Sequence, residues 1–188
     1  MTDLIDIAKP FADLDTHVDA ETERKIINWV HGEARFLDAE RYEEWLDRFI
    51  DKDVQYWMPD METRRRDDAR GMFCYGESAY FDDNWSELQI RVKRYNEPSA
   101  WADNPQTRHA HLISNIEVFA TDDPTLFAVH SAFTNVRNRN EADQDIIHGR
   151  REDVLKLSED GFAGYRLLRR RVFIVQNVLL SKNLNTFF

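Results

Sequence analysis

The chain has 188 residues, a length typical of a single domain with its own hydrophobic core. Hydrophobic residues make up 42% of it and the formal net charge is −10, which argues against a nucleic-acid-binding surface because phosphate contacts need a basic face. The N-terminal residues show neither a basic region followed by an apolar run nor a stretch long enough to span a membrane. We therefore expect a globular, cytoplasmic protein.

The first half of the sequence predicts an N-terminal arm followed by helices. Residues 1–18 alternate apolar and acidic segments and are expected to form the arm, and residues 19–188 to form one domain. Apolar residues at helical spacing predict a helix over 21–37 with Asp19 as its N-cap. The other elements expected here are a helix over 38–51, a strand over 54–58 and a helix from Asp82 or Asp83 to Pro98.

The second half changes to long extended runs separated by short turn sequences. Such turns join neighbouring antiparallel strands rather than crossover helices, which predicts a meander. The predicted strands cover residues 107–121, 125–138, 143–158 and 163–178, with turns at 122–124, 140–142 and 159–161. Helices first and an antiparallel sheet afterwards predict an α+β domain whose helices pack on one face of a strongly curved sheet.

Few residues have the spacing of a metal or redox site. Cys74 is the single cysteine, which excludes an internal disulfide and any cluster that needs two thiolates from this chain. Its apolar neighbours predict a buried, unreactive thiol. His109 and His111, at i and i+2 of a strand, could share one face and hold a metal together with a carboxylate. Because two histidines alone are a weak signature, histidines that hydrogen-bond on the sheet are the favoured interpretation.

His130 is the one candidate for a general base. It lies among the small residues Ala128, Ala132 and Thr134, which could leave a pocket beneath it, and a carboxylate on another strand could orient its ring. This alternative would make the chain a free-standing dehydratase or isomerase. An ordinary buried histidine is the more frequent outcome for such a pattern.

Charged residues within the last two strands and two phenylalanines at residues 187 and 188 indicate a partner surface. With a turn at 159–161, the charges at 150–153 come opposite those at 169–171 and pair across the strands. Three consecutive arginines beside an apolar run favour a protein–protein contact, since arginine forms bidentate pairs and tolerates interfaces. The predicted contact residues are Arg150, Arg151, Arg169, Arg170, Arg171, Phe187 and Phe188. On this hypothesis, Arg170→Glu weakens assembly more than it lowers the melting temperature.

Several segments, in their order along the chain, resemble the small (β) subunit of bacterial aromatic-ring-hydroxylating dioxygenases. These enzymes are the Rieske non-haem iron oxygenases that act on compounds such as biphenyl, benzene, cumene or phenylpropionate. The resemblance covers nearly the whole length. The segments that carry it are Arg41-Tyr42-Glu43-Glu44-Trp45-Leu46, Tyr56-Trp57-Met58-Pro59, Arg108 to Asn115, Gly149-Arg150-Arg151-Glu152-Asp153, and Ser181-Lys182-Asn183-Leu184 with Phe187-Phe188.

The resemblance implies a cone-shaped fold of the nuclear-transport-factor and scytalone-dehydratase type, and a hexamer of three α and three β chains. It also implies that the Rieske [2Fe–2S] centre and the mononuclear iron lie in the large subunit. That subunit uses electrons relayed from NADH by ferredoxin and reductase to convert an aromatic ring to a cis-dihydrodiol. The small subunit is then chiefly structural, so we transfer no catalytic, cofactor or metal residue to this chain. A Rieske centre takes two cysteines and two histidines, and Cys74 stands alone.

Overall fold

The computed structural model describes residues 6–9, 11, 16–97, 99, 106–141, 143–181 and 184–188. Most of the predicted arm, as well as Lys182 and Asn183 of the quoted C-terminal segment, lies outside these residues. The helices are α1 (Ala20–Asp38), α2 (Tyr42–Phe49) and α3 (Trp85–Arg94). The strands are β1 (Ile50–Pro59), β2 (Ala79–Asn84), β3 (Arg108–Ala120), β4 (Leu126–Arg139), β5 (Asp143–Phe162) and β6 (Tyr165–Ile174).

The helix starts follow local capping chemistry. The Asp19 side chain accepts hydrogen bonds from the N–H groups of Glu21 and Thr22, which confirms the predicted cap of α1. The predicted cap of α3 at Asp82 or Asp83 is wrong, because Asn84 forms a capping box with Glu87 and the residues before it belong to β2. Helix α3 therefore begins directly at the end of a strand.

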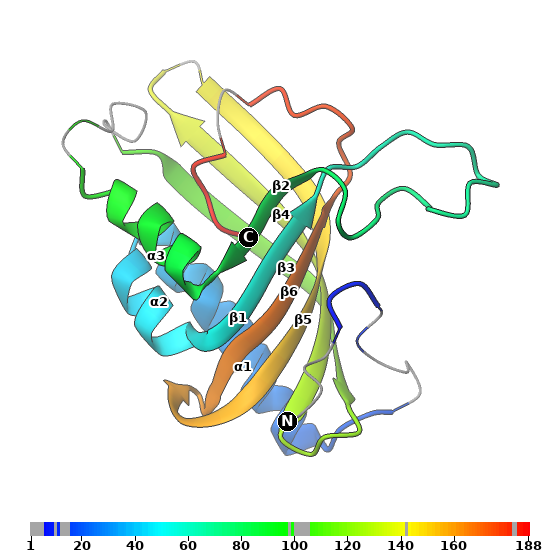
Figure 1. The fold of residues 1–188 in the computed structure, drawn as a ribbon. Coiled ribbons are helices and arrows are strands. Elements are labelled where there is room, and N and C mark those ends of the chain that lie inside the picture. The colour runs from blue at the N-terminus through cyan, green and yellow to red at the C-terminus, as the bar shows by residue number, and fades with distance from the viewer. Residues whose placement is uncertain are drawn as a thin grey trace.

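One six-stranded sheet has the order β2-β1-β6-β5-β4-β3 (Figure 1). The antiparallel meander from β3 to β6 is as predicted. The sequence pattern did not predict that β1 pairs in parallel with β6, or that β2 forms the sheet edge antiparallel to β1. These pairings join residues more than 100 positions apart in the sequence, such as Tyr56 and Arg170, and no local periodicity encodes them.

The β5–β6 turn lies further along the chain than expected. Residues 159–161, predicted as the turn, lie within β5, which runs to Phe162. The chain reverses at Ala163 and Gly164, whose φ angles are 51° and 91°. Positive φ at both central residues matches a two-residue type I′ hairpin, the turn whose twist suits antiparallel strands. A bulge between Leu157 and Phe162 takes up the additional residues.

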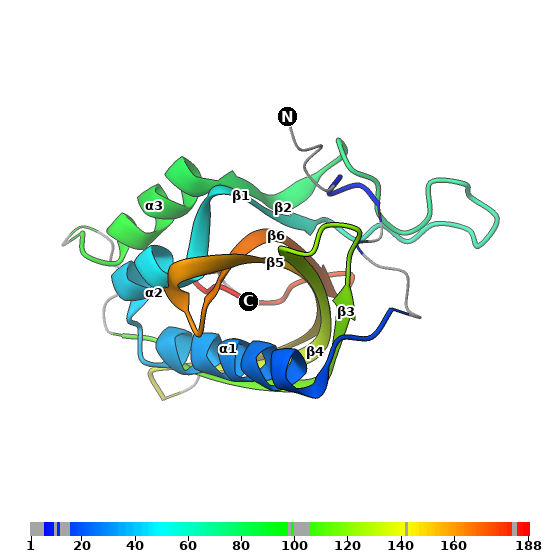
Figure 2. The ribbon, with the colours of Figure 1, turned by 90° about the horizontal axis from the view of Figure 1, so that it is seen from below.

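The curved sheet wraps around an interior that α1 closes on its open side (Figure 2). The main hydrophobic cluster fills this interior, and the last residues of the chain enter it, so that the C-terminus lies at the centre of the ring of strands (Figure 2). A second cluster on the convex face of the sheet packs Ile7 and Phe11 against Trp57, Phe119 and Phe173. This arrangement of helices on one face of a curved, mainly antiparallel sheet is the predicted α+β cone.

Candidate functional site

The charged residues of β5 and β6 alternate between the two faces of the sheet. Strand geometry sends successive side chains to opposite sides, so three consecutive arginines cannot share one surface. Arg170 lies opposite Asp153, and Arg171 opposite Glu152, which confirms the predicted cross-strand charge pairing. Arg170 and Asp153 face the interior, whereas Arg171 and Glu152 face the convex side.

A buried ion cluster lies at the centre of the interior. Arg170 contacts both oxygens of Asp153 at 2.8 and 2.7 Å and both oxygens of Glu33 on α1 at 2.9 and 2.8 Å. Arg151 donates to Glu33 at 3.1 Å, and the Trp45 indole N–H donates to the same carboxylate at 3.1 Å. Arg170 and Glu33 are fully buried, and Arg151 and Asp153 are 1% exposed. Two arginines and two carboxylates thus connect α1 to the two strands.

The charges of this cluster sustain one another. Burial by itself raises the pKa of Glu33, but the nearby Arg170 and Arg151 guanidinium groups outweigh burial and hold that pKa below its usual value. Burial likewise lowers the pKa of Arg170, but Asp153 and Glu33 raise it well above the usual value. The Glu33 carboxylate is ionised and accepts hydrogen bonds on both oxygens, and each Asp153 oxygen accepts one hydrogen bond from Arg170. The cluster therefore suits a structural role better than proton transfer.

The C-terminal residues lie against this cluster. The Phe188 main-chain oxygen accepts hydrogen bonds from Arg170 at 2.5 Å and from the Tyr56 hydroxyl at 3.0 Å, and the Phe188 N–H donates to the same hydroxyl at 2.8 Å. Burial raises the pKa of Tyr56, so the phenol stays neutral and can donate. The side chains of Phe187 and Phe188 are each 1% exposed. The expectation of an exposed aromatic tail is wrong because the cone interior takes up both rings.

The other predicted contact residues also pack mainly within the chain. Arg151, Arg169, Arg170 and Arg171 are buried. Arg171 pairs with Glu152 at 3.3 Å and donates to the main-chain oxygen of Lys9, and Arg169 donates to the main-chain oxygen of Asp53. In the single chain these four side chains have little accessible surface, and their contact with another subunit stays a prediction. Arg150 alone of the seven is exposed, above the Phe173 ring at 4.6 Å, and it stays a predicted contact.

The His130 ring faces the convex side of β4, where its Nε2 is buried without a hydrogen-bond partner among the described residues. Its ring packs edge-on against Phe119, at a centroid distance of 5.4 Å, and Phe119 belongs to the convex-face cluster. The neighbouring residue Val129 faces the other way and belongs to the main hydrophobic cluster of the interior. The geometry therefore does not support a general base at His130 acting in the cone interior.

His109 and His111 do share the interior face, as strand spacing predicted. His111 is held by Asp38 at the end of α1, 2.6 Å from its Nδ1, and its Nε2 lies 2.9 Å from the Phe187 main-chain oxygen. Burial and the neighbouring His111 lower the pKa of His109 to about 4. Among the described residues no three histidine, cysteine, aspartate or glutamate side chains are grouped to hold a metal ion. Cys74 is half-buried and lies in the loop before β2.

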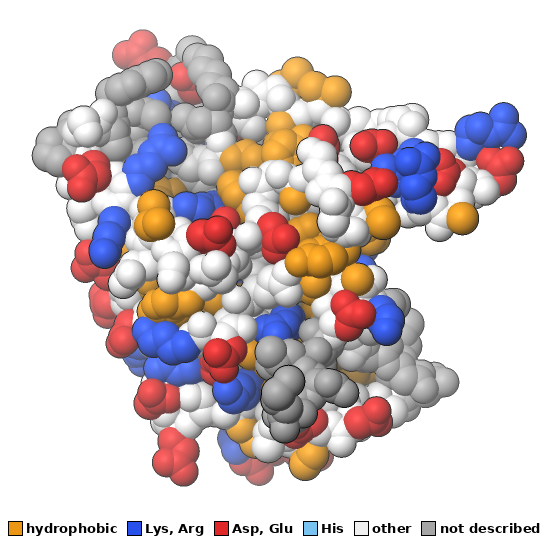
Figure 3. All heavy atoms as spheres, in the orientation of Figure 1, with side chains coloured by type: hydrophobic (Ala, Val, Ile, Leu, Met, Phe, Trp, Pro, Cys, Tyr) orange, Lys and Arg blue, Asp and Glu red, His pale blue; other side chains and the backbone are white. Residues whose placement is uncertain are grey.

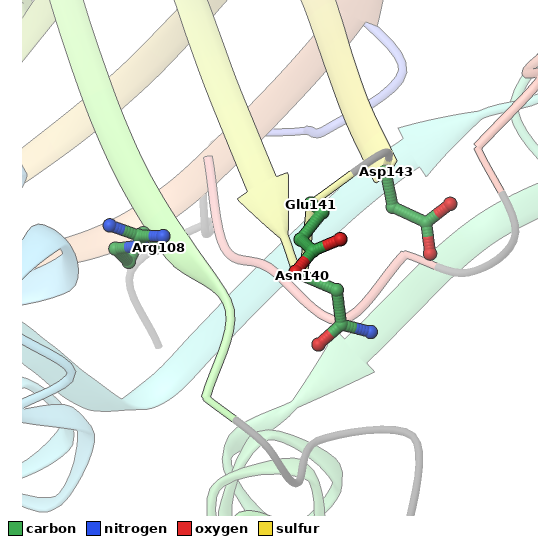
Figure 4. Close-up of a pocket in the computed structure, with 4 residues that line it drawn as sticks. All are labelled: Arg108, Asn140, Glu141 and Asp143. Atoms are coloured by element: carbon green, nitrogen blue, oxygen red, sulfur yellow. The ribbon is translucent and has the colours of Figure 1, made fainter.

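A hollow of about 680 Å³ opens at the sheet end where β4 turns into β5. Figure 4 shows Asn140, Glu141 and Asp143 together at this turn, with Arg108 at the start of β3 across from them. The lining is polar and open to solvent, unlike the apolar, enclosed clefts that usually bind small molecules. We assign no chemistry to it.

Two residues of the cone interior were not predicted as functional from the sequence, although their positions in the pattern indicate that they face inward. Glu33 lies three and seven residues after Val30 and Ile26, so it falls on the apolar stripe of α1, where a carboxylate needs a buried partner. Tyr56 lies on the inward side of β1 together with Val54 and Met58. A charged residue on an apolar stripe, read together with inward-facing arginines, would have predicted the cluster.

Comparison with known proteins agrees with this architecture. The sequence model of the ring hydroxylating beta subunit family matches residues 32–181, which is more than half of the chain. This chain belongs to that family. It is 34% identical over 172 residues to the biphenyl 2,3-dioxygenase subunit beta of Rhodococcus jostii, covering 91% of each chain. It is 31% identical over 189 residues to the benzene 1,2-dioxygenase subunit beta of Pseudomonas putida, covering 100% of each.

Solved structures show the same fold. A chain of naphthalene 1,2-dioxygenase with indole bound in the active site superposes with a TM-score of 0.83 at 24% identity, covering 93% of this chain and 90% of that one. A putative scytalone dehydratase from Novosphingobium aromaticivorans gives a TM-score of 0.58 at 15% identity, covering 83% and 85%. The predicted cone fold is thereby confirmed. As a member of the β-subunit family, the chain is the non-catalytic subunit of a multicomponent aromatic-ring dioxygenase, an oxidoreductase.

Proposed function

We propose that the work of this chain is to assemble and stabilise an oxygenase in which it joins a large subunit as a hexamer of three α and three β chains. The assembled enzyme adds dioxygen across an aromatic ring to give a cis-dihydrodiol, with electrons from NADH. The large subunit holds the Rieske [2Fe–2S] centre and the mononuclear iron. The complex works in the cytoplasm; among the described residues no helix is long and apolar enough to cross a membrane.

The observation that carries this proposal is the filled interior of the cone. Its volume is occupied by the chain's own rings, Phe187 and Phe188 among them, and by an ion cluster whose charges are matched. A domain that fills its own interior with side chains in this way is suited to rigid support. Chemistry on a substrate would need a polar site that the substrate can reach.

Contact with other subunits then needs an exposed surface, and the described residues include an apolar patch that suits such a contact. It follows β6, where Val175, Val178 and Leu180 are 74%, 69% and 88% exposed. Ile146 lies beside it, because the Gln176 side chain donates to the Ile146 main-chain oxygen at 2.9 Å. Figure 3 shows hydrophobic side chains at the top of this face, around the coil that follows β6. Charged side chains predominate on the loop that projects between β1 and β2. Such a patch marks a protein contact, and we propose that it faces a neighbouring subunit.

Co-expression with the large subunit tests both parts of the proposal. Val178→Asp combined with Leu180→Asp should prevent formation of the hexamer, as measured by gel filtration with light scattering, because two charges would be buried at the contact. Ile90→Asp is the matched control, since Ile90 is 68% exposed on α3 and lies outside the patch. An intact hexamer in the double variant would remove the patch from the interface. If the large subunit alone formed a stable oligomer and carried out ring dihydroxylation at the same rate without the β chain, the structural role itself would be refuted.

A further inference from the structure

The last four residues lie inside the cone in the manner of a bound peptide. They belong to neither a helix nor a strand. Buried main-chain oxygens usually pair with N–H groups of a neighbouring strand, but here side chains from separate elements provide the donors. The bonds run from Tyr95 Oη to the Asn185 oxygen at 2.5 Å, from Arg91 Nη2 to Thr186 at 3.0 Å, from His111 Nε2 to Phe187 at 2.9 Å, and from Tyr56 Oη to Phe188 at 3.0 Å.

The two aromatic side chains occupy well-defined positions. The Phe187 ring lies 4.6 Å from the Trp45 ring and 5.4 Å from the Tyr42 ring, and the Arg91 guanidinium lies 4.5 Å from its centroid. The Phe188 ring lies 5.3 Å from Phe133. An aromatic ring enclosed by rings and one cation is a typical anchor position in peptide recognition.

The side chains that hold the tail are themselves held by groups outside it. Arg91 pairs with Asp83 at 2.6 Å. Asp38 orients His111, and Glu33 orients Trp45. Binding groups that are positioned before the ligand arrives lose little freedom on binding, which raises affinity. Arg91, His111 and Trp45 are therefore held in place by contacts that do not involve the tail.

We propose that the interior of the cone is a binding site for a short extended peptide with two adjacent aromatic residues, and that residues 184–188 are its intramolecular ligand. Side-chain donors bind the main-chain oxygens of the peptide, and the pocket of Trp45, Tyr42 and Arg91 binds the first ring. When its own tail is absent, the cone binds a separate peptide of the same chemistry.

The test uses a chain that stops after Ser181, co-expressed and purified with the large subunit. Isothermal titration with a synthetic peptide of residues 184–188 should show one site per β chain. A peptide with alanine in place of Phe187 should bind roughly 30-fold more weakly, the loss expected for a buried aromatic anchor. Tyr56→Phe in the shortened chain removes the hydroxyl that bonds Phe188 twice, and should weaken binding of the unaltered peptide by about 10-fold. Equal binding of both peptides, or no binding to a folded complex, would overturn the proposal.

A second variant covers the outcome in which the shortened chain fails to fold. Phe187→Ala in the full chain leaves a ring-sized void beside Trp45, and an apolar void of this kind can bind benzene. Benzene should therefore raise the melting temperature of the Phe187→Ala complex more than that of the unaltered complex. The unaltered complex also corrects for benzene bound to the large subunit. An equal rise in both would contradict an anchor pocket at this position.

Discussion

Arg170→Met provides the sharpest test of the interior ion cluster. The Arg170 guanidinium makes five hydrogen bonds, two to Asp153, two to Glu33 and one to the Phe188 main-chain oxygen. Methionine keeps the unbranched apolar part of the side chain but lacks the guanidinium group, so it makes none of them. Two buried carboxylates then share Arg151 as their nearest remaining cation. Breaking a fully buried pair by removing one partner costs about 3–5 kcal/mol.

This cost is large enough to measure clearly. For a domain of this size each kcal/mol corresponds to a shift of about 2–4 °C, so the melting temperature should fall by roughly 6–20 °C. Urea unfolding of the purified chain, followed by tryptophan fluorescence, gives the free energy of unfolding directly. Arg150→Met is the matched control, because Arg150 is exposed and its nearest oxygen on Glu152 is 3.8 Å away. That change should stay within about 0.5 kcal/mol.

The comparison of the two variants separates a packing role from an interface role. If Arg170 served mainly in contacts between subunits, Arg170→Met would weaken the hexamer but leave the free energy of unfolding of the isolated chain close to that of Arg150→Met. Burial in the cone predicts the reverse order, with the isolated chain already destabilised. Equal free energies of unfolding for the two variants would therefore refute the structural assignment of the cluster.

Two further predictions concern other parts of the interior. The folded state lowers the pKa of His109 from 6.5 to about 4, so on acidification the unfolded chain binds the proton first. The free energy of unfolding is therefore highest above pH 6.5 and falls by about 3 kcal/mol between pH 6.5 and 4. His109→Gln should flatten this pH dependence in urea unfolding, and an unchanged slope would contradict the assignment. A Cβ atom at Gly149 would lie 2.4 Å from the Phe173 main-chain oxygen and 2.7 Å from the Phe133 ring, so Gly149→Ala should cost about 1–3 kcal/mol, whereas an unchanged urea midpoint would show that β5 can shift at this position.

The sequence predicted those features that depend on neighbouring residues. Asp19 caps α1 because a carboxylate next to the first turn satisfies free N–H groups, and this chemistry is visible in any short window. The pattern also placed the charges at 150–153 opposite those at 169–171, but not the individual pairs, because the turn lies at Ala163-Gly164 and a bulge shifts the register. Local chemistry therefore gave the meander and its charge pairing.

The features that were missed depend on contacts between distant segments. The parallel pairing of β1 with β6 and the entry of Phe187 and Phe188 into the cone leave no periodic mark on the sequence. The sequence pattern indicated a partner surface at the two phenylalanines, but whether a side chain is exposed is decided by the space that a curved sheet leaves open. Strand alternation alone could have corrected the arginine assignment, because only Arg170 of the three can face inward with Val172.

The segments that carry the family resemblance meet inside the cone, which indicates that they have a shared structural role. Asp153, from the segment that begins at Gly149, and Phe188, from the C-terminal segment, both bind Arg170. Tyr56, from a third segment, bonds Phe188 as well. These residues hold the sheet, α1 and the tail to one another. The segments that resemble the family therefore contribute the contacts that close the cone. An arrangement of this kind places no demand on which aromatic ring is oxidised, which agrees with the similarity of this chain to β subunits of enzymes named for biphenyl and for benzene.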